Sequence, residues 1–167
     1  GEKITAIENA LNAKPPLTLP HVKTNRFISV IPINYGCLGK CAYCCVMFAR
    51  GRLRSYSISE IVERVKHDLA TGVKEFWLTS QDTACYGKDA STSLAALIEA
   101  AANVQGAFQI RIGMMTPNTA MSFLNKMVEA FWNERVFKFV HLPVQSGDNE
   151  VLKRMHRFYT VEDFKTI

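Results

Sequence analysis

Four short segments rich in β-branched and aromatic residues recur along the chain, and a helical pattern follows each of them. The segments are 26–34, 73–80, 108–114 and 137–141, and their composition predicts strands. They start near residues 27, 74, 108 and 137, at intervals of 47, 34 and 29 residues. One βα unit occupies roughly 30 residues. Repetition of such units predicts an α/β fold, a parallel sheet with helices packed on its outside.

The helical patterns carry recognisable start and stop signals. Ser57 and Glu60 have the spacing of a capping box ahead of an apolar stripe, and Gly72 stands where that helix would end. Further helical periodicity covers 93–104, 119–132 and 148–156. Thr160 resembles the N-cap of one more helix.

Length and the placement of prolines suggest how the chain is organised. The 167 residues fit one domain. Residues 1–25 carry a helical pattern over 2–13 that runs into Pro15, Pro16 and Pro20, so we expect a lead-in arm there and a core over 26–167. Because a helix cap stands close to the last residue, Ile167, we expect the core to be truncated and its sheet to continue beyond the chain.

Composition narrows the class of protein. Hydrophobic residues make up 48% and charged residues 21%, which is typical of a soluble globular protein. No apolar run approaches the roughly 20 residues of a membrane span, and no signal peptide is visible. We therefore expect a cytoplasmic protein. The net charge of +5 permits an anionic partner such as RNA.

The cysteine spacing is the most specific signal. Cys37, Cys41 and Cys44 form a C-x3-C-x2-C pattern directly after the first predicted strand. Three thiolates can hold three irons of a four-iron four-sulfur ([4Fe–4S]) cluster, so that the fourth iron remains open. An open iron can bind the amino and carboxylate groups of S-adenosylmethionine and pass an electron into it. Cys45 and Cys85 lie outside the triad and are expected to be small buried or semi-buried thiols.

A zinc loop is the alternative interpretation of the same residues. Structural zinc takes four ligands, commonly from two close pairs, and the sequence has no second C-x2-C or H-x3-H pair. A fourth ligand could come from Cys45, Cys85 or His141. The corresponding function would be a non-catalytic zinc-binding and RNA-binding module.

The pattern resembles the radical S-adenosylmethionine (radical SAM) superfamily, whose partial (βα)6 barrel carries three such cysteines with an aromatic residue, here Tyr43, before the last. About four of the six βα units are visible. Within the superfamily the chain is similar to the methylthiotransferases, in the segments 48–51, 80–83 and 141–147. Segments 49–56, 76–83 and 111–118 are most similar to the archaeal and eukaryotic branch, which acts on N6-threonylcarbamoyladenosine in tRNA.

This resemblance implies roles for individual residues. Cys37, Cys41 and Cys44 would be the cluster ligands, and Tyr43 would face the adenine of S-adenosylmethionine. Ser80 and Gln81 would hold its methionine amino group. Arg111 and Gln145 are the remaining cofactor-binding candidates, for the carboxylate and the ribose hydroxyls. The alternatives are that Gln145 caps a helix and that Arg111 pairs with an acid. No catalytic residue beyond these is predicted.

The resemblance also implies a reaction. The protein would be a transferase that converts N6-threonylcarbamoyladenosine, next to the anticodon of a tRNA, to its 2-methylthio derivative. It would need an electron donor and a second [4Fe–4S] cluster from a domain outside this chain, so the chain alone would be incomplete for sulfur transfer. Alternative substrates are isopentenyladenosine in tRNA or a ribosomal protein. Basic side chains near the cysteines are candidates for RNA contacts: Lys40, Arg50, Arg52 and Arg54.

Overall fold

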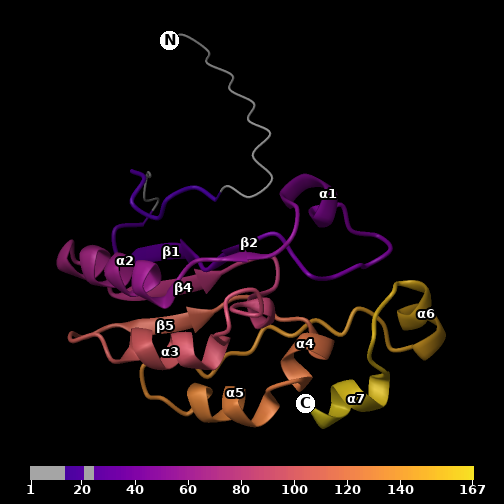
Figure 1. The fold of residues 1–167 in the computed structure, drawn as a ribbon. Helices are drawn as coiled ribbons and strands as arrows, with labels where there is room; N and C mark the ends of the chain where they lie inside the picture. Colours follow the sequence, from indigo (N-terminus) through magenta and orange to yellow (C-terminus); the bar gives the residue numbers. More distant parts are fainter. Residues whose placement is uncertain (1–13, 21–24) are drawn as a thin grey trace.

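A three-stranded parallel sheet forms the centre of the protein (Figure 1). The computed structural model describes residues 14–20 and 25–167; the helical pattern over 2–13 lies outside them. Strands β1 (Ile28–Pro32), β4 (Glu75–Thr79) and β5 (Gln109–Ile112) pair in the order β1-β4-β5. The predicted α/β class is therefore confirmed.

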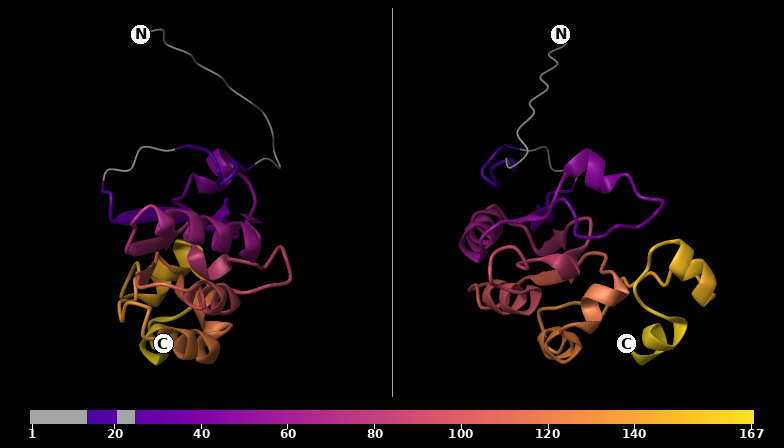
Figure 2. Two further views of the ribbon diagram at one scale, coloured as in Figure 1. Left: turned by 90° about the vertical axis from the view of Figure 1, so that its left-hand side faces the viewer. Right: turned by 45° about the vertical axis from the view of Figure 1, so that its right-hand side comes forward.

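Three helices cover one face of this sheet. Helices α2 (Ile58–Ala70), α3 (Leu94–Ala102) and α5 (Leu124–Phe131) stack side by side, as the end view in Figure 2 shows. The predicted capping box of α2 is confirmed: Glu60 N–H donates to Ser57 Oγ at 3.2 Å, and Ser57 N–H donates to Glu60 Oε2 at 2.7 Å. The boundary at Gly72 is confirmed as well, because α2 ends at Ala70 and Gly72 has a φ of 94°.

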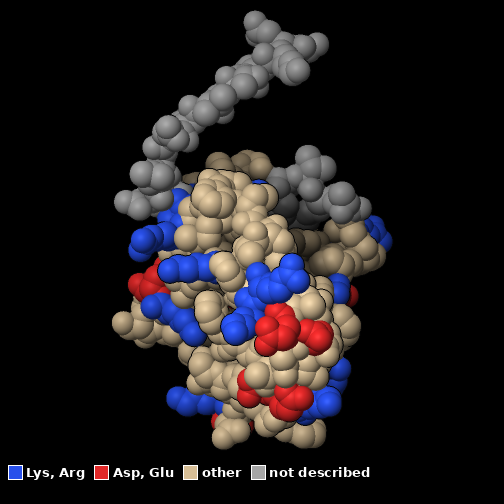
Figure 3. Space-filling view, turned by 90° about the vertical axis from the view of Figure 1, so that its right-hand side faces the viewer, with Lys and Arg blue, Asp and Glu red and all other residues tan. Residues whose placement is uncertain are grey.

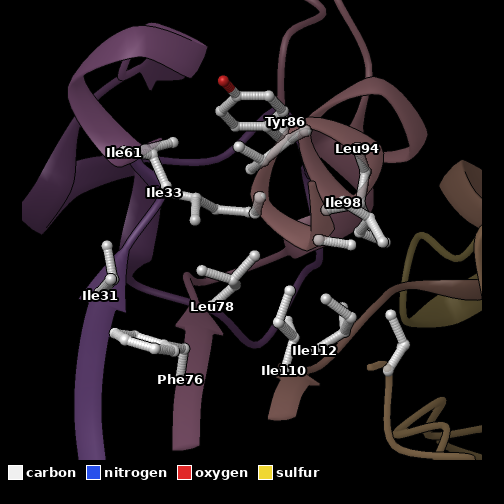
Figure 4. Close-up of a cluster of buried hydrophobic side chains, with 14 of the residues drawn as sticks. Ile31, Ile33, Ile61, Phe76, Leu78, Tyr86, Leu94, Ile98, Ile110 and Ile112 are labelled. Atoms are coloured by element: carbon white, nitrogen blue, oxygen red, sulfur yellow. The ribbon is translucent and has the colours of Figure 1, made fainter. Parts of the chain in front are cut away.

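The core lies between the sheet and these helices. Every second side chain of the strands points toward the helices, and burial of their apolar surface is the main stabilising contribution. Figure 4 shows this cluster: Ile31, Ile33, Ile61, Phe76, Leu78, Tyr86, Leu94, Ile98, Ile110 and Ile112. The opposite face of the sheet is less covered, and Val30 on the edge strand β1 is 51% exposed.

Short elements link and follow the strands. Strands β2 (Asn34–Tyr35) and β3 (Arg54–Ser55) form a small antiparallel pair that the sequence did not predict. The remaining elements, in chain order, are α1 (Val46–Arg50), the 3₁₀ helix η1 (Thr83–Cys85), α4 (Pro117–Met121), α6 (Asn149–Arg154) and α7 (Val161–Thr166). The predicted cap at Thr160 is confirmed, because its hydroxyl accepts a hydrogen bond from Asp163 N–H at 3.1 Å.

The fourth predicted strand, 137–141, is wrong: this segment runs beside β5 without forming a regular strand. One parallel bridge joins Ile110 and Val136, with Phe137 N–H donating to the carbonyl of Ile110 at 2.9 Å. At the other end of the segment, Met115 N–H donates to the carbonyl of His141 at 2.9 Å. In the part of the chain that is described, no strand pairs with its outer edge, and Phe139 and Val140 are exposed. A segment at the edge of a sheet leaves the backbone groups of its outer side unpaired.

The predicted helix over 119–132 is divided into α4 and α5. The Ser122 hydroxyl donates to the carbonyl of Thr119 at 2.7 Å, a local bond that competes with helical pairing. Phe123 then leaves the helical conformation, with φ −145° and ψ 29°, and packs against the core. Tertiary burial of one aromatic ring therefore overrides the continuous helical periodicity.

The described part of the expected lead-in arm, 14–20, packs on the core. Leu17 is buried, Tyr56 Oη donates to the carbonyl of Pro15 at 2.5 Å, and Lys14 Nζ donates to the carbonyl of Ser55 at 2.7 Å. Among the described residues, no helix has the length and apolar character that crossing a membrane requires.

Candidate metal centre

The three cysteines of the triad lie in one loop, between β2 and α1. The pairing of β2 with β3 closes the base of this loop, and Cys37 N–H donates to the carbonyl of Gly51 at 3.4 Å. Gly36 has a φ of 71°, and a Cβ there would overlap the carbonyl oxygen of Arg52. Only glycine fits such a close approach of two backbone segments, so the sequence fixes where the loop starts.

Two of the sulfurs face the same small space. A Cβ at Gly39 would lie 3.3 Å from Cys37 Sγ and 3.6 Å from Cys41 Sγ. Backbone donors already point at sulfur: Gly39 N–H donates to Cys37 Sγ at 3.2 Å, and Val46 N–H donates to Cys44 Sγ at 3.4 Å. Such N–H···S bonds stabilise thiolates and are one determinant of iron–sulfur potentials.

The thiols influence one another's protonation. The pKa of Cys37 is lowered to about 6, chiefly by a hydrogen bond with the Cys85 thiol, which burial of Cys37 opposes. The pKa of Cys41 is raised, chiefly by burial; the positive charge of Arg157 opposes this rise, and Cys44 and Cys37 add to it. Within the described residues, no three His, Cys, Asp or Glu side chains stand close enough to enclose a single metal ion.

The two remaining cysteines differ from each other. Cys85 is buried, as expected, and its Sγ donates to Asp82 Oδ2 at 2.9 Å; its contact with Cys37 was not predicted. Cys45 is exposed, contrary to expectation. It lies directly before α1, at the end of the cysteine loop.

The carboxyl end of β4 presents two unsatisfied acceptors. Ser80 Oγ and Gln81 Oε1 are buried and have no hydrogen-bond partner in the described part of the protein. Both amide atoms of Asn34, the first residue of β2, are also buried without a partner in the described part of the protein. A buried polar atom without a partner is costly, so the oxygens of Ser80 and Gln81 are free to accept hydrogen bonds from a donor such as an ammonium group. The importance of Asn34 was missed, although it is a polar residue directly before the cysteine loop.

Arg111 and Gln145 lie in different environments. The guanidinium carbon of Arg111 stands 4.6 Å from the ring centroid of Trp77 and 4.8 Å from that of Phe139. Among the described residues no Asp or Glu forms an ion pair with it. Gln145 is exposed with a φ of 73°. Asp148 caps α6 instead, by accepting from Val151 N–H at 2.8 Å, so Gln145 is not a helix cap.

These groups lie at one end of the sheet, where its parallel strands end. Figure 3 views the molecule from that side, and Lys and Arg side chains gather across the middle of the face. A pocket of about 320 Å³ opens beside the cysteine loop. Its lining includes Lys40, Cys41, Lys88, His156 and Arg157.

A three-cysteine loop and unsatisfied polar atoms lie at the carboxyl ends of the parallel strands. This arrangement is typical of a class of α/β protein that binds its ligand at the mouth of a barrel. The Radical SAM superfamily profile matches residues 31–167, and the chain belongs to this superfamily. The resemblance seen in the sequence is confirmed.

Two relatives in sequence are both named as threonylcarbamoyladenosine tRNA methylthiotransferases. The chain is 44% identical over 168 residues to the probable threonylcarbamoyladenosine tRNA methylthiotransferase of Pyrococcus abyssi, covering 100% of this chain and 40% of that protein. It is 43% identical over 153 residues to the threonylcarbamoyladenosine tRNA methylthiotransferase of Homo sapiens, covering 90% of this chain and 26% of the relative. The chain therefore spans less than half the length of these relatives.

A solved structure supports the fold. The radical S-adenosylmethionine methyltransferase TsrM from Kitasatospora setae, with cobalamin and a [4Fe-4S] cluster bound, superimposes with a TM-score of 0.65 at 14% identity, over 83% of this chain and 27% of TsrM.

Proposed function

We propose that this chain forms the radical-generating core of a tRNA methylthiotransferase that converts N6-threonylcarbamoyladenosine to its 2-methylthio derivative. The observation that carries the proposal is the cysteine loop at the carboxyl end of a parallel sheet, beside the unsatisfied oxygens of Ser80 and Gln81. The relatives in archaea and in Homo sapiens support the choice of substrate.

The residues present fit an open-iron cluster with S-adenosylmethionine. Cys37, Cys41 and Cys44 would hold three irons, and the small space at Gly39 keeps two of their sulfurs accessible. When bound, the cluster and cofactor supply one-electron chemistry that can remove hydrogen from an unactivated carbon such as C2 of adenine. This chain's part is to bind and orient the cofactor and the base.

Five side chains have roles in that orientation. Ser80 Oγ and Gln81 Oε1 accept hydrogen bonds from the methionine amino group. Arg111, between two aromatic rings, presents its remaining donors to the carboxylate. Gln145, exposed on the next loop, contacts the ribose hydroxyls. Tyr43, in the cysteine loop itself, lies against the adenine.

The RNA would approach the basic face shown in Figure 3. Lys40 and Arg52 are exposed, whereas Arg50 stands 5.6 Å over the Tyr35 ring and its carbonyl accepts a bond from Arg54. Phe48, 93% exposed, offers a flat surface on which an unstacked base can lie. A nucleotide in an anticodon loop can be splayed out to reach such a site.

The complete reaction needs parts outside this chain. We propose that the whole protein carries a second [4Fe–4S] cluster near which the transferred sulfur resides, receives electrons from a separate donor, and acts on tRNA in the cytoplasm. Residues 26–167 would then be the radical SAM core, and 1–25 its connection to a preceding domain.

Anaerobic reconstitution with iron and sulfide tests the proposal. We expect about four irons per chain, and 5′-deoxyadenosine after addition of S-adenosylmethionine and dithionite. The full-length protein should form the 2-methylthio product on tRNA carrying N6-threonylcarbamoyladenosine, and this chain alone should not. Bound zinc in place of iron would favour the zinc module, and product only on isopentenyladenosine tRNA would show that the substrate is wrong.

A further inference from the structure

Arg157 is a buried cation without an acidic partner. It is 9% exposed, and its Nε is buried with no hydrogen-bond partner. In the described part of the chain, no Asp or Glu forms an ion pair with it. An uncompensated buried charge is strongly unfavourable. An anion beside this guanidinium would therefore stabilise the folded protein.

The surroundings of Arg157 belong to the cysteine loop. Arg157 Nη2 donates to Tyr43 Oη at 2.5 Å, and its guanidinium carbon stands 5.6 Å from the Tyr43 ring centroid. Next to this contact, Ala42 N–H, on the residue before Tyr43, donates to the carbonyl of Met155 at 3.1 Å. The segment after α6 is therefore joined to the loop between its second and third cysteines.

Local backbone geometry fixes this contact. Helix α6 ends at Arg154, and the chain reverses at His156, whose φ is 56°. Arg157 N–H then donates to the carbonyl of Leu152 at 2.9 Å. This turn directs the Arg157 side chain into the pocket beside the loop rather than into solvent.

Two groups near Arg157 can be anionic. Asp82 lines the same pocket, but its carboxylate already accepts hydrogen bonds from the backbone N–H groups of Ala84 and Thr116, and it forms no ion pair with Arg157. Cys41 is the other: its side chain lines the same pocket as Arg157. A thiolate-held iron–sulfur cluster on Cys41 would supply the missing negative charge.

We propose that Arg157 is a positioning residue of the metal centre: its buried cation balances the negative charge of a cluster held by Cys41 and its neighbours, and its hydrogen bond orients Tyr43. This inference rests on the proposed function, because it requires a cluster in the loop. Net charge and hydrogen bonds around a cluster set its reduction potential, so a buried cation makes the cluster easier to reduce.

A set of matched variants separates charge from geometry. Arg157→Gln removes the cation, Arg157→Lys retains a cation but not the planar fork, and Tyr43→Phe retains the cation but not the hydrogen bond. Arg154→Gln is the control, because it removes the same charge from an exposed position at the end of α6.

The readout is the midpoint potential of the reconstituted protein, from a redox titration followed by electron paramagnetic resonance, with iron content and the gain in Tm on reconstitution. We expect a more negative midpoint and a smaller Tm gain for Arg157→Gln, and wild-type midpoints for Arg157→Lys and Arg154→Gln. Tyr43→Phe should keep the midpoint but weaken the spectral response to S-adenosylmethionine.

Different results overturn different statements. A wild-type midpoint and iron content in Arg157→Gln would overturn the role of Arg157 while leaving the cluster in place. Absence of iron from the wild-type protein would overturn the proposed function instead. If Arg157→Gln does not fold, Arg157→Lys decides: a midpoint more negative than in Arg154→Gln contradicts a charge effect, and an equal one supports it.

Discussion

The carboxylate of Asp82 accepts two hydrogen bonds from Thr116, one from the backbone N–H at 3.0 Å and one from the hydroxyl at 2.5 Å. Asp82 follows β4 and Thr116 follows β5, so the pair ties together the carboxyl ends of two neighbouring strands. Asp82 is buried and also accepts from Ala84 N–H at 3.1 Å. It thereby fixes the turn that carries Ser80 and Gln81.

Asp82→Ala is expected to destabilise the fold by about 3 kcal/mol, because buried donors of Thr116 and Ala84 lose a charged acceptor. Urea unfolding measures the change in the free energy of unfolding. Thr116→Ser, which keeps both donors, is the control and should remain close to wild type. A loss below about 0.5 kcal/mol in Asp82→Ala would show that water replaces the carboxylate there.

Replacement of Cys37, Cys41 or Cys44 by Ala should abolish the iron–sulfur absorbance after anaerobic reconstitution, because each removes a thiolate ligand. Cys45→Ala and Cys85→Ala should leave it largely intact. Iron analysis of the same samples checks the absorbance. Equal loss in all five variants would contradict the assignment of the ligands.

Gly36→Ala should destabilise the protein by about 2 kcal/mol or more, since the residue would be held at positive φ with its Cβ against a backbone oxygen. Gly147→Ala is the matched control, because a Cβ there meets nothing within 4 Å and its φ is not positive. Thermal unfolding of both variants gives the comparison. A Gly36→Ala protein as stable as the control would mean that the loop can shift away from Arg52.

Gly39→Ala should leave the free energy of unfolding nearly unchanged but lower the iron content. Its Cβ would lie in contact with the sulfurs of Cys37 and Cys41, in space that cluster ligands need. The measurement is iron per chain after reconstitution, compared with Gly147→Ala. Full iron loading of Gly39→Ala would show that the two sulfurs do not bind the metal from this side.

Glu60 should contribute an acid-dependent part of the stability. Burial raises the pKa of this carboxyl, but hydrogen bonds from the Ser57 N–H and hydroxyl, with the Lys14 ammonium, lower it overall. Because the folded pKa is below the unfolded one, the contribution is complete above the unfolded pKa and is lost as the pH falls through the folded pKa. The difference in Tm between wild type and Glu60→Gln should therefore shrink toward low pH. A constant difference would contradict this.

Sequence patterns predicted the strands, helix boundaries and loops that neighbouring residues determine. Strand composition located β1, β4 and β5, and two residues three apart, Ser57 and Glu60, located the start of α2. The cysteine loop and the polar pair after β4 were visible for the same reason, because neighbouring residues form them.

What depends on distant residues was not predictable. Regular pairing of 137–141 requires a neighbour on its outer edge, and β2 and β3 are too short to leave a compositional signal. Phe123 interrupts a periodic helix because of where its ring is buried. The burial of Arg157 against Tyr43, 114 positions away, follows from the turn after α6 and from no pattern around either residue.

The β2–β3 pair has a thermodynamic consequence for metal uptake. Asn34 pairs with Ser55, and Tyr35 pairs with Arg54. This pairing holds the two ends of the cysteine loop together before any metal arrives. The entropy of closing the loop is therefore lost during folding rather than on metal binding, and the iron-free loop searches a limited set of conformations. Hydrogen exchange of the iron-free protein should show protected amides at the two strands and at Ala42, whose N–H donates to the carbonyl of Met155, and faster exchange in the rest of the loop.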